Sequence, residues 1–378
     1  MKILMVSMPS LHFFRWTEQL KDAGHEIYWF DVTDGGSKVE RIFWVHQIVG
    51  WKLKWKYPGR YFIKNKLPKV YALLQQFNEN NTAKIFEQKL LEIKPDVVHS
   101  FALYVSCSPI LSVMQKHPTI KWCYSSWGSD LFYFQNQSIY LKDIKAVLPR
   151  INYLFSDCYR DFEIAKKYGF DGKFLGVFPG GGGFSLDEME NYSMPFEDRN
   201  TILIKGFQGR SGKALVVLNA ISQLEKELEK YKIVIFGADK EVLQYFHKSK
   251  LANWSTASIS GKMTHLEVLK LMGSSLIYIG NSNSDGIPNT MLEAICMNVF
   301  PIQSNPGGVT QEIITHQKNG LLIEDCENVD EIISNIKWAI TNDIKNMVHY
   351  NSNEIRLTLD YNYIKEKVSK EYEFMSLD

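Results

Sequence analysis

The sequence predicts an α/β protein with two domains, each built on a parallel sheet that helices cover on both faces. The chain has 378 residues, which is more than one ordinary hydrophobic core holds. Short apolar strand runs alternate with helical patterns through most of its length. This alternation restarts after residues 179–200, a loop rich in Pro, Gly and acidic residues. We therefore expect two Rossmann-like domains that face each other across a cleft.

The first predicted domain spans residues 1–182. Its first strand is Lys2–Ser7; this apolar run breaks at Pro9 with no small-residue cleavage site behind it, so it does not read as a signal peptide. A helix is expected near residues 15–23, with Gly24 as its C-terminal stop. Later strands are expected at Glu26–Asp31, 96–100 and 122–125.

The second predicted domain spans residues 195–345, after a linker at residues 183–194. Residues 346–378 are predicted to form a helical segment that crosses back to the first domain. The strands expected in the second domain are Thr201–Lys205, 232–237, 258–260, 276–280 and 299–303.

Composition excludes several classes of function. The formal net charge of +1 gives no overall attraction for a polyanion, so nucleic acid is not an expected partner. The five cysteines and nine histidines show no CxxC, HExxH or HxH spacing, which predicts no metal site and reduced thiols in a cytoplasmic protein. No run of 18 apolar residues occurs, so any membrane contact is expected to be peripheral.

Residues 41–71 differ from the rest of the chain because they contain eight Lys or Arg residues, eight aromatic residues and no Asp or Glu. Cations meet anionic head groups, and Trp or Tyr suits the polar boundary of a bilayer. The segment therefore predicts contact with an anionic membrane, on its inner, cytoplasmic face. The alternative is a solvated basic face whose aromatic side chains belong to the core.

Residues 282–295 are the most informative segment, and they follow the predicted strand at 276–280. Pro288 is expected to open a helix at its first position, after a loop shaped by Asp285 and Gly286. The free amides and positive dipole end of such a helix bind phosphate at the carboxyl edge of a sheet. Glu293 then lies in the second turn, where its carboxylate can accept both hydroxyls of a ribose. The alternative is an acid at a helix start and an ordinary surface Glu.

Residues 204–215 place glycines and three cations between a strand and a helix. Glycines such as Gly206 let backbone amides approach a pyrophosphate, and Lys or Arg neutralises its charge. The segment is not a Walker A loop, because Ala214 follows Lys213 where that motif has Ser or Thr. Solvated cations are the alternative, although positive charge at a helix start is unfavourable without an anion. The cations are Lys205, Arg210 and Lys213.

The spacing of Asp285 and Glu293 resembles the acid-x7-Glu motif of the retaining glycosyltransferases of family four, which have the two-domain fold called GT-B. Residues 306–312 and 319–322 match the family's continuation after the next strand. Asp285 replaces the more usual first Glu. The resemblance covers nearly the whole chain and is sharpest in residues 205–322.

The resemblance implies a role for each part of the motif. The second acid, Glu293, would hold the nucleotide ribose, and Asp285 would contact the transferred sugar. Arg210 and Lys213 would contact the diphosphate, with Lys205 as a competing candidate, and Met263 would lie by the nucleobase or pack in the core. The catalytic set is thus Arg210, Lys213 and Asp285. The donor-binding set is Lys205, Gly206, Met263, Gly286, Ile287, Pro288, Asn289 and Glu293.

The acceptor side of the resemblance is weaker. Residues 126–130 look like the family's His-Gly-Ser-Asp loop, but Trp127 stands at the usual His position, so that histidine cannot be carried over. Asp130 either orients an acceptor hydroxyl or caps a helix, and His99 is either functional or buried in the core. The family's glycine-rich turn after the first strand is also absent. The acceptor-side candidates are His12, Arg15, His99, Trp127 and Asp130.

These observations predict a retaining hexosyltransferase that uses a nucleoside-diphosphate sugar, with UDP favoured and GDP possible, and no metal or other cofactor. The acceptor is expected to be a glycan or a lipid-linked molecule of cell-surface polysaccharide or glycolipid synthesis. A nucleotide-sugar epimerase of the same fold and a non-catalytic nucleotide- or lipid-binding protein are the alternatives. A NAD-linked dehydrogenase is disfavoured because no strand is followed by GxGxxG with an acid about twenty residues later.

Overall fold

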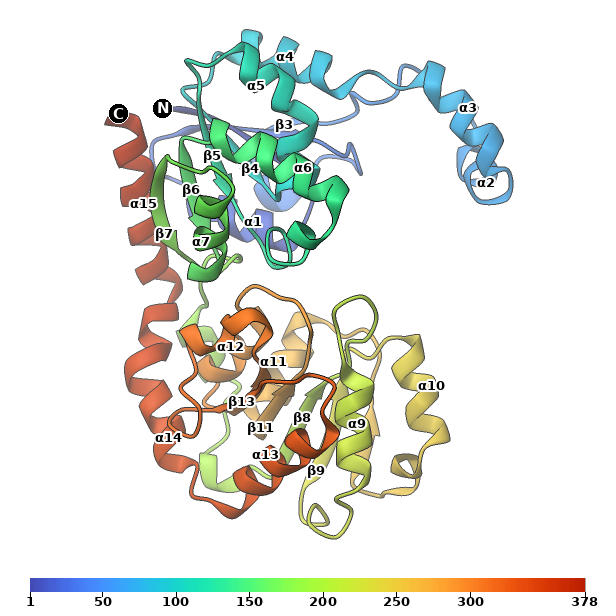
Figure 1. Cartoon of the computed structure of the whole chain (residues 1–378), viewed down its shortest axis with the longest axis vertical. Coiled ribbons are helices and arrows are strands. Elements are labelled where there is room, and N and C mark those ends of the chain that lie inside the picture. The colour runs from blue at the N-terminus through green and yellow to red at the C-terminus, as the bar shows by residue number, and fades with distance from the viewer. Residues whose placement is uncertain (378) are drawn as a thin grey trace. The chain divides into compact units, whose positions relative to one another are not determined.

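The computed structural model describes residues 1–377, and the chain divides into two compact units. Unit 1 comprises Met1–Ser156, Phe162–Gly181 and the C-terminal part from Val368. Unit 2 comprises Asp157–Asp161 and Gly182–Lys367. Each unit contains one sheet of parallel strands, which confirms the predicted pair of Rossmann-like domains (Figure 1).

Unit 1 has a seven-stranded sheet in the order β3-β2-β1-β4-β5-β6-β7. The order reverses direction between β1 and β4, which are neighbours with Ile3 opposite Val97. The interior of β1 is fully buried, as expected where helices cover both faces of a parallel sheet. The strands are β1 (Lys2–Ser7), β2 (Glu26–Asp31), β3 (His46–Ile48), β4 (Val97–Phe101), β5 (Lys121–Ser125), β6 (Tyr153–Ser156) and β7 (Lys173–Val177).

The first helix of unit 1 differs from its predicted position at residues 15–23. It begins at Leu11 because Ser10 caps it, with the Ser10 hydroxyl accepting a hydrogen bond from the amide of Phe13 at 3.2 Å. It ends at Glu18, and tight turns lead to Gly24, whose φ of 73° suits glycine. The helices of this part of the chain are α1 (Leu11–Glu18), α2 (Arg60–Lys66), α3 (Pro68–Asn78), α4 (Thr82–Ile93), α5 (Leu111–Lys116), α6 (Ser138–Val147) and α7 (Tyr159–Lys167).

Unit 2 has a six-stranded sheet in the order β10-β9-β8-β11-β12-β13. Its strands are β8 (Thr201–Lys205), β9 (Lys232–Phe236), β10 (Ala257–Ile259), β11 (Ser275–Gly280), β12 (Phe300–Ser304) and β13 (Leu321–Ile323). Its helices are α8 (Leu186–Glu190), α9 (Ala214–Ser222), α10 (Lys240–Lys248), α11 (His265–Gly273), α12 (Asn289–Cys296), α13 (Val329–Thr341) and α14 (Lys345–Tyr350).

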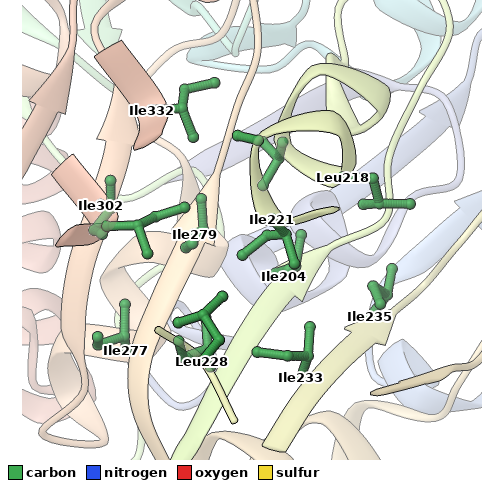
Figure 2. Packing of buried hydrophobic residues seen from close by; sticks show 14 of the residues in the cluster. Ile204, Leu218, Ile221, Leu228, Ile233, Ile235, Ile277, Ile279, Ile302 and Ile332 are labelled. Carbon is green, nitrogen blue, oxygen red and sulfur yellow. The ribbon is translucent and has the colours of Figure 1, made fainter. Parts of the chain in front are cut away.

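The two faces of the unit 2 sheet carry separate hydrophobic clusters. Ile202 and Ile204 point to the face covered by α9, α10 and α13, whereas Leu203 packs with α11 and α12 on the other face. Figure 2 shows the first cluster, in which Ile204 and Ile279 of adjacent strands pack beneath Ile221 of α9. Aliphatic residues of the parallel strands therefore pack against helices on both faces of the sheet. The polar loops follow the ends of the strands.

The last helix, α15 (Tyr361–Leu377), ends among the residues of unit 1. Tyr372 is fully buried there. Its hydroxyl accepts a hydrogen bond from the Trp16 indole at 3.1 Å and lies 2.6 Å from Nδ1 of His99. The C-terminal residues from Val368 therefore contribute an aromatic side chain to the core of the first unit.

Candidate active site

The two predicted donor-binding segments meet at one edge of the unit 2 sheet. Residues 206–213 follow β8 and residues 281–288 follow β11, and these adjacent strands mark the point where the strand order reverses. In α/β sheets, ligands bind outside the carboxyl ends of the strands at such a point. Backbone hydrogen bonds join the two segments, from Lys213 N to Asn281 O at 3.0 Å and from Asn283 N to Ser211 O at 2.9 Å.

Two glycines allow the chain to pass close to its neighbours at this edge. A Cβ on Gly206 would lie 2.7 Å from Cα of Ala238, and one on Gly286 would lie 2.1 Å from Oδ2 of Asp157. A side chain at position 206 would collide with the backbone of Ala238, and one at position 286 would force the Asp157 carboxylate to move. The loop carrying Asp285 therefore passes very close to Asp157.

Three cations from two segments of unit 2 act on the charge of Asp285. Burial raises the pKa of its carboxyl group, while the charges of Lys205, Arg160 and Arg210 and the amide of Gly286 oppose that rise. The residue is half-buried. The structure therefore brings together one acid and two of the three cations that the sequence predicted for the diphosphate.

Arg160 is a site residue that sequence reasoning missed. Its guanidinium group donates hydrogen bonds to the backbone oxygens of Asp285, at 2.8 Å, and Pro306, at 2.7 Å. It also pairs at 2.9 Å with the fully buried carboxylate of Asp161. Arg160 therefore fixes the loop that presents Asp285. Arg160 lies at the start of α7, 125 positions before Asp285 in the chain, so no local pattern indicates this contact.

Glu293 lies in the second turn of α12, as predicted, and only 7% of its surface is exposed. Its Oε1 lies 2.8 Å from Nε2 of His265, the first residue of α11. Thr264 fixes the start of α11 through a capping box with Glu267. His265 was not among the predicted site residues.

One predicted detail of this edge, the first residue of α12, is corrected. Pro288 is the residue that precedes α12, with a ψ of 114°, and the first helical residue is Asn289. Ile287 is 8% exposed and packs in the hydrophobic cluster with Met291, so it can offer a ligand its backbone but little of its side chain. Met263 is half-buried against the same cluster.

The three predicted cations have different surroundings. Arg210 is exposed, and the ammonium of Lys205 lies 5.8 Å from the centroid of the Phe207 ring. Lys213 forms an ion pair with Glu327, and this hydrogen bond raises the pKa of the lysine. A diphosphate would therefore have to compete with Glu327 for Lys213.

Three of the predicted acceptor-side residues, His12, Arg15 and Trp127, lie together in unit 1. They surround Gly180 and Gly181, the last residues of the segment Phe162–Gly181. A Cβ on Gly181 would lie 3.4 Å from Nδ1 of His12 and 3.7 Å from Cδ of Arg15. A Cβ on Gly180 would lie 3.3 Å from Cδ1 of Trp127. The rings of His12 and Trp127 have centroids 6.1 Å apart. His12 is exposed and Trp127 is half-buried, so this group can meet a ligand.

His99 and Asp130 do not belong to that group. His99 is fully buried, its Nε2 lies 2.8 Å from the Ser125 hydroxyl, and burial lowers its pKa to about 3. Asp130 is 3% exposed and accepts hydrogen bonds from the Tyr124 hydroxyl and, at 2.7 Å, from the amide of Leu103. For both residues the structure favours the structural alternative, because both side chains are buried and hydrogen-bonded within unit 1.

Asp157, Cys158 and Asp161 form a buried group whose possible ligand atoms lie within 4.8 Å of one another. The sequence predicted no metal here. Arg160 already supplies a positive charge to Asp161, and burial raises the pKa of the Cys158 thiol well above its usual range. This arrangement suits the ion pair with Arg160 better than a metal cation.

Residues 190–356 match the family model for glycosyl transferases group 1. The matched region contains both donor-binding segments and lies within unit 2. A search of curated proteins finds no match to the chain.

Solved structures resemble the whole chain. A sucrose-phosphate synthase from Thermosynechococcus elongatus has 13% identity and a TM-score of 0.72, over 100% of this chain and 99% of that one. A glycosyltransferase from Rickettsia africae has 18% identity and a TM-score of 0.67, over 99% and 98%. Anabaena HepE, solved in complex with UDP and glucose, has 11% identity and a TM-score of 0.67, over 99% and 100%. These likenesses confirm the predicted GT-B fold class.

Proposed function

We propose that this chain is a glycosyltransferase, in keeping with the family model that its second half matches and with the fold it shares with solved glycosyltransferases. It would move a hexose-type sugar from a nucleoside diphosphate to a glycan or lipid-linked acceptor, with retention of configuration at the anomeric carbon. The observation that carries the proposal is the edge of the unit 2 sheet where the loops after β8 and β11 meet. There Lys205, Arg210 and Asp285 lie together. The product would enter cell-surface polysaccharide or glycolipid synthesis, on the cytoplasmic side of the membrane.

The donor would lie along this edge, where its ribose, its sugar and its diphosphate would each contact different side chains. The carboxylate of Glu293 accepts hydrogen bonds from the ribose hydroxyls, and Asp285 contacts hydroxyls of the sugar. Arg210 and Lys205 face the diphosphate, and Lys213 joins them when it leaves Glu327. UDP is the favoured nucleotide, because the similar HepE was solved with UDP and glucose.

The reaction would break the bond between the anomeric carbon and a diphosphate oxygen and form a bond from that carbon to the acceptor oxygen on the same face. The acceptor's proton would pass to the departing diphosphate. Negative charge grows on the diphosphate as the bond breaks, so cations fixed beside it stabilise the transition state more than the bound donor. Protein cations at the β8 edge would supply this stabilisation in place of a metal ion.

Product stereochemistry tests this function. We expect transfer from a UDP-sugar to a lipid-linked or glycan acceptor, detected by mass, with the anomeric configuration of the donor preserved in the product's NMR spectrum. GDP-sugars should react more slowly. An inverted product would contradict the retaining mechanism. A donor sugar isomerised without any acceptor would instead indicate an epimerase of the same fold.

Membrane association is proposed for the helical hairpin of α2 and α3 in unit 1. No helix within residues 1–377 is both long and apolar enough to cross a bilayer. The hairpin nevertheless exposes large apolar side chains, with Tyr61 at 76%, Phe62 at 65% and Phe77 at 66%. No residue of α2 is buried. Exposed aromatic residues beside unneutralised cations suit an anionic bilayer surface.

Charge reversal on this hairpin should weaken vesicle binding. Replacing Lys66 and Lys69 with Glu reverses the attraction to an anionic surface, so we expect less protein to sediment with vesicles that contain anionic lipid. The remaining binding should also depend less on salt. The matched control replaces Lys226 and Lys230, two exposed lysines of unit 2, with Glu. Equal sedimentation of wild type and the hairpin variant would contradict membrane association.

A further inference from the structure

Unit 1 contains a cavity of about 1060 Å³ that the donor site does not use. It is lined by the loop after β2, by residues 50–53 and by the first part of the α2–α3 hairpin. Every lining residue belongs to unit 1. The cavity is therefore a property of one unit and does not depend on the other.

Four cations line the cavity: Lys52, Lys56, Arg60 and Lys64. No ion pair found within residues 1–377 involves any of them. Only two acids, Asp34 and Glu79, are in the lining. Both oxygens of Asp34 are already occupied by backbone amides, those of Gly50 and, at 2.9 Å, Lys52. Four cations against two acids leave the lining with an excess of positive charge, which favours an anionic ligand.

Aromatic hydroxyls accompany the cations. Arg60 donates hydrogen bonds to the hydroxyl of Tyr71 at 3.0 and 3.3 Å, which orients its guanidinium group. The hydroxyl oxygen of Tyr57, a lining residue, is buried and has no hydrogen-bond partner within residues 1–377. A guanidinium group, ammonium groups and a free hydroxyl are the donors that a phosphate ester accepts from.

The surroundings of the cavity indicate that the phosphate is attached to a lipid. Tyr61 and Phe62 line the cavity and are also among the most exposed apolar residues of the chain. The following helix, α3, exposes Leu73 at 57% and Phe77 at 66%. A free anion would need no apolar rim. A phosphate on a hydrocarbon chain would use the cations with its head and the rim with its chain.

We propose that this cavity holds the phosphate group of one lipid molecule, and that this lipid is the phosphate-bearing, lipid-linked acceptor. The identity of the lipid as acceptor rests on the proposed function, whereas the phosphate site itself rests on unit 1 alone. The site differs from general attraction to a membrane because it binds one headgroup, with saturation. The residues that bind the phosphate are Lys56, Arg60, Lys64 and Tyr57.

Calorimetry with a short-chain alkyl phosphate below its micelle concentration tests the site in the full-length protein. We expect saturable binding with one molecule per chain. An alkyl alcohol of the same chain length and inorganic phosphate should each bind at least about tenfold more weakly, because each lacks half of the recognised group. Inorganic phosphate that binds as tightly as the alkyl phosphate would overturn the lipid assignment. Absence of saturable alkyl phosphate binding would overturn the site.

A matched pair of variants separates the site from diffuse electrostatics. Lys56→Gln with Lys64→Gln removes two lining cations, and Lys66→Gln with Lys69→Gln removes two cations of the same hairpin outside the lining. We expect the first pair to weaken alkyl phosphate binding about tenfold for each cation and the second to leave it nearly unchanged. Equal losses would overturn the proposal.

Two further measurements keep the outcome interpretable. Tyr57→Phe removes only the hydroxyl and should still weaken alkyl phosphate binding several-fold, even if the lysine variants fold poorly. UDP binding, measured on the same samples, tests unit 2 independently. Loss of alkyl phosphate binding in the variants with intact UDP binding supports the cavity. If the wild-type protein binds UDP but no alkyl phosphate, the proposed phosphate site in the cavity is wrong, whereas the proposed donor site in unit 2 is unaffected.

Discussion

Replacing Arg210 with alanine is expected to lower turnover by about 10²- to 10³-fold, the usual effect of removing one donor that stabilises transition-state charge. The guanidinium group lies on the loop after β8 and contributes to the electrostatic environment of Asp285. Its attraction to the diphosphate grows as the bond to the sugar breaks. Affinity for UDP should therefore fall much less than turnover. UDP has no bond to a sugar, so its binding does not include the attraction that increases as that bond breaks.

Single-turnover kinetics and calorimetry with UDP measure the two quantities separately. Lys270→Ala is the control, since it removes an exposed cation of unit 2 from the body of α11. Chelator should leave wild-type activity largely intact. Activity that disappears with chelator and returns with a divalent ion would show that a metal neutralises the diphosphate. Equal losses of affinity and turnover in Arg210→Ala would mean that the arginine only binds the nucleotide.

The sequence predicted the sheets better than the ends of the helices. The nine strands expected from apolar runs all occur, each within one residue of its expected bounds. Buried parallel strands are continuous apolar runs, so their signal is local. The first helix begins at Leu11 and not at residue 15, because the decisive feature is the Ser10 cap. The short strands β3, β6, β7 and β13 were not named in advance.

The candidate site was predictable where its residues follow one another in a motif. The loops after β8 and β11 meet because both strands end at the same edge, and this follows from the alternating pattern. Arg160 and His265 were missed because they act through contacts with residues more than 25 positions away in the chain. Spacing within a segment carries no information about such contacts.

For His99 the sequence left two alternatives open, and the structure favours burial. A histidine at the end of a strand suggests a ligand-binding group, yet its partners, Tyr372 and Ser125, come from an element 273 residues away and from the adjacent strand. Burial then keeps the imidazole neutral. Whether a polar residue at a strand end faces a ligand or the core depends on which helix covers that face, and here the last helix of the chain does so.

The second large effect concerns Glu293, the residue that we propose binds the ribose. Glu293→Ala removes hydrogen bonds to a charged acceptor, worth roughly 1.5 to 3 kcal/mol, so affinity for UDP should fall about ten- to a hundredfold. The intact donor should lose affinity equally, since both ligands carry the ribose. Asp285→Asn should leave UDP affinity unchanged and lower the affinity of the intact donor or its turnover. Only the intact donor carries the transferred sugar that Asp285 is proposed to contact.

A substitution of His265 provides a control for Glu293→Ala, because the two side chains contact each other. Because its ring lies 2.8 Å from the Glu293 carboxylate, part of any loss in Glu293→Ala reflects the broken pair. His265→Ala breaks the pair but keeps the carboxylate, so it should weaken UDP binding less than Glu293→Ala does. A loss as large in His265→Ala as in Glu293→Ala would show that the pair, and not the ribose contact, supports nucleotide binding.

Calorimetry of UDP and of the intact UDP-sugar with wild type, Glu293→Ala and Asp285→Asn tests the donor site most directly. We expect Glu293→Ala to weaken the binding of both ligands about equally and Asp285→Asn to leave UDP affinity unchanged. Unchanged UDP affinity in Glu293→Ala would contradict the assignment of Glu293 to the ribose, because Glu293 would then be an ordinary residue of α12.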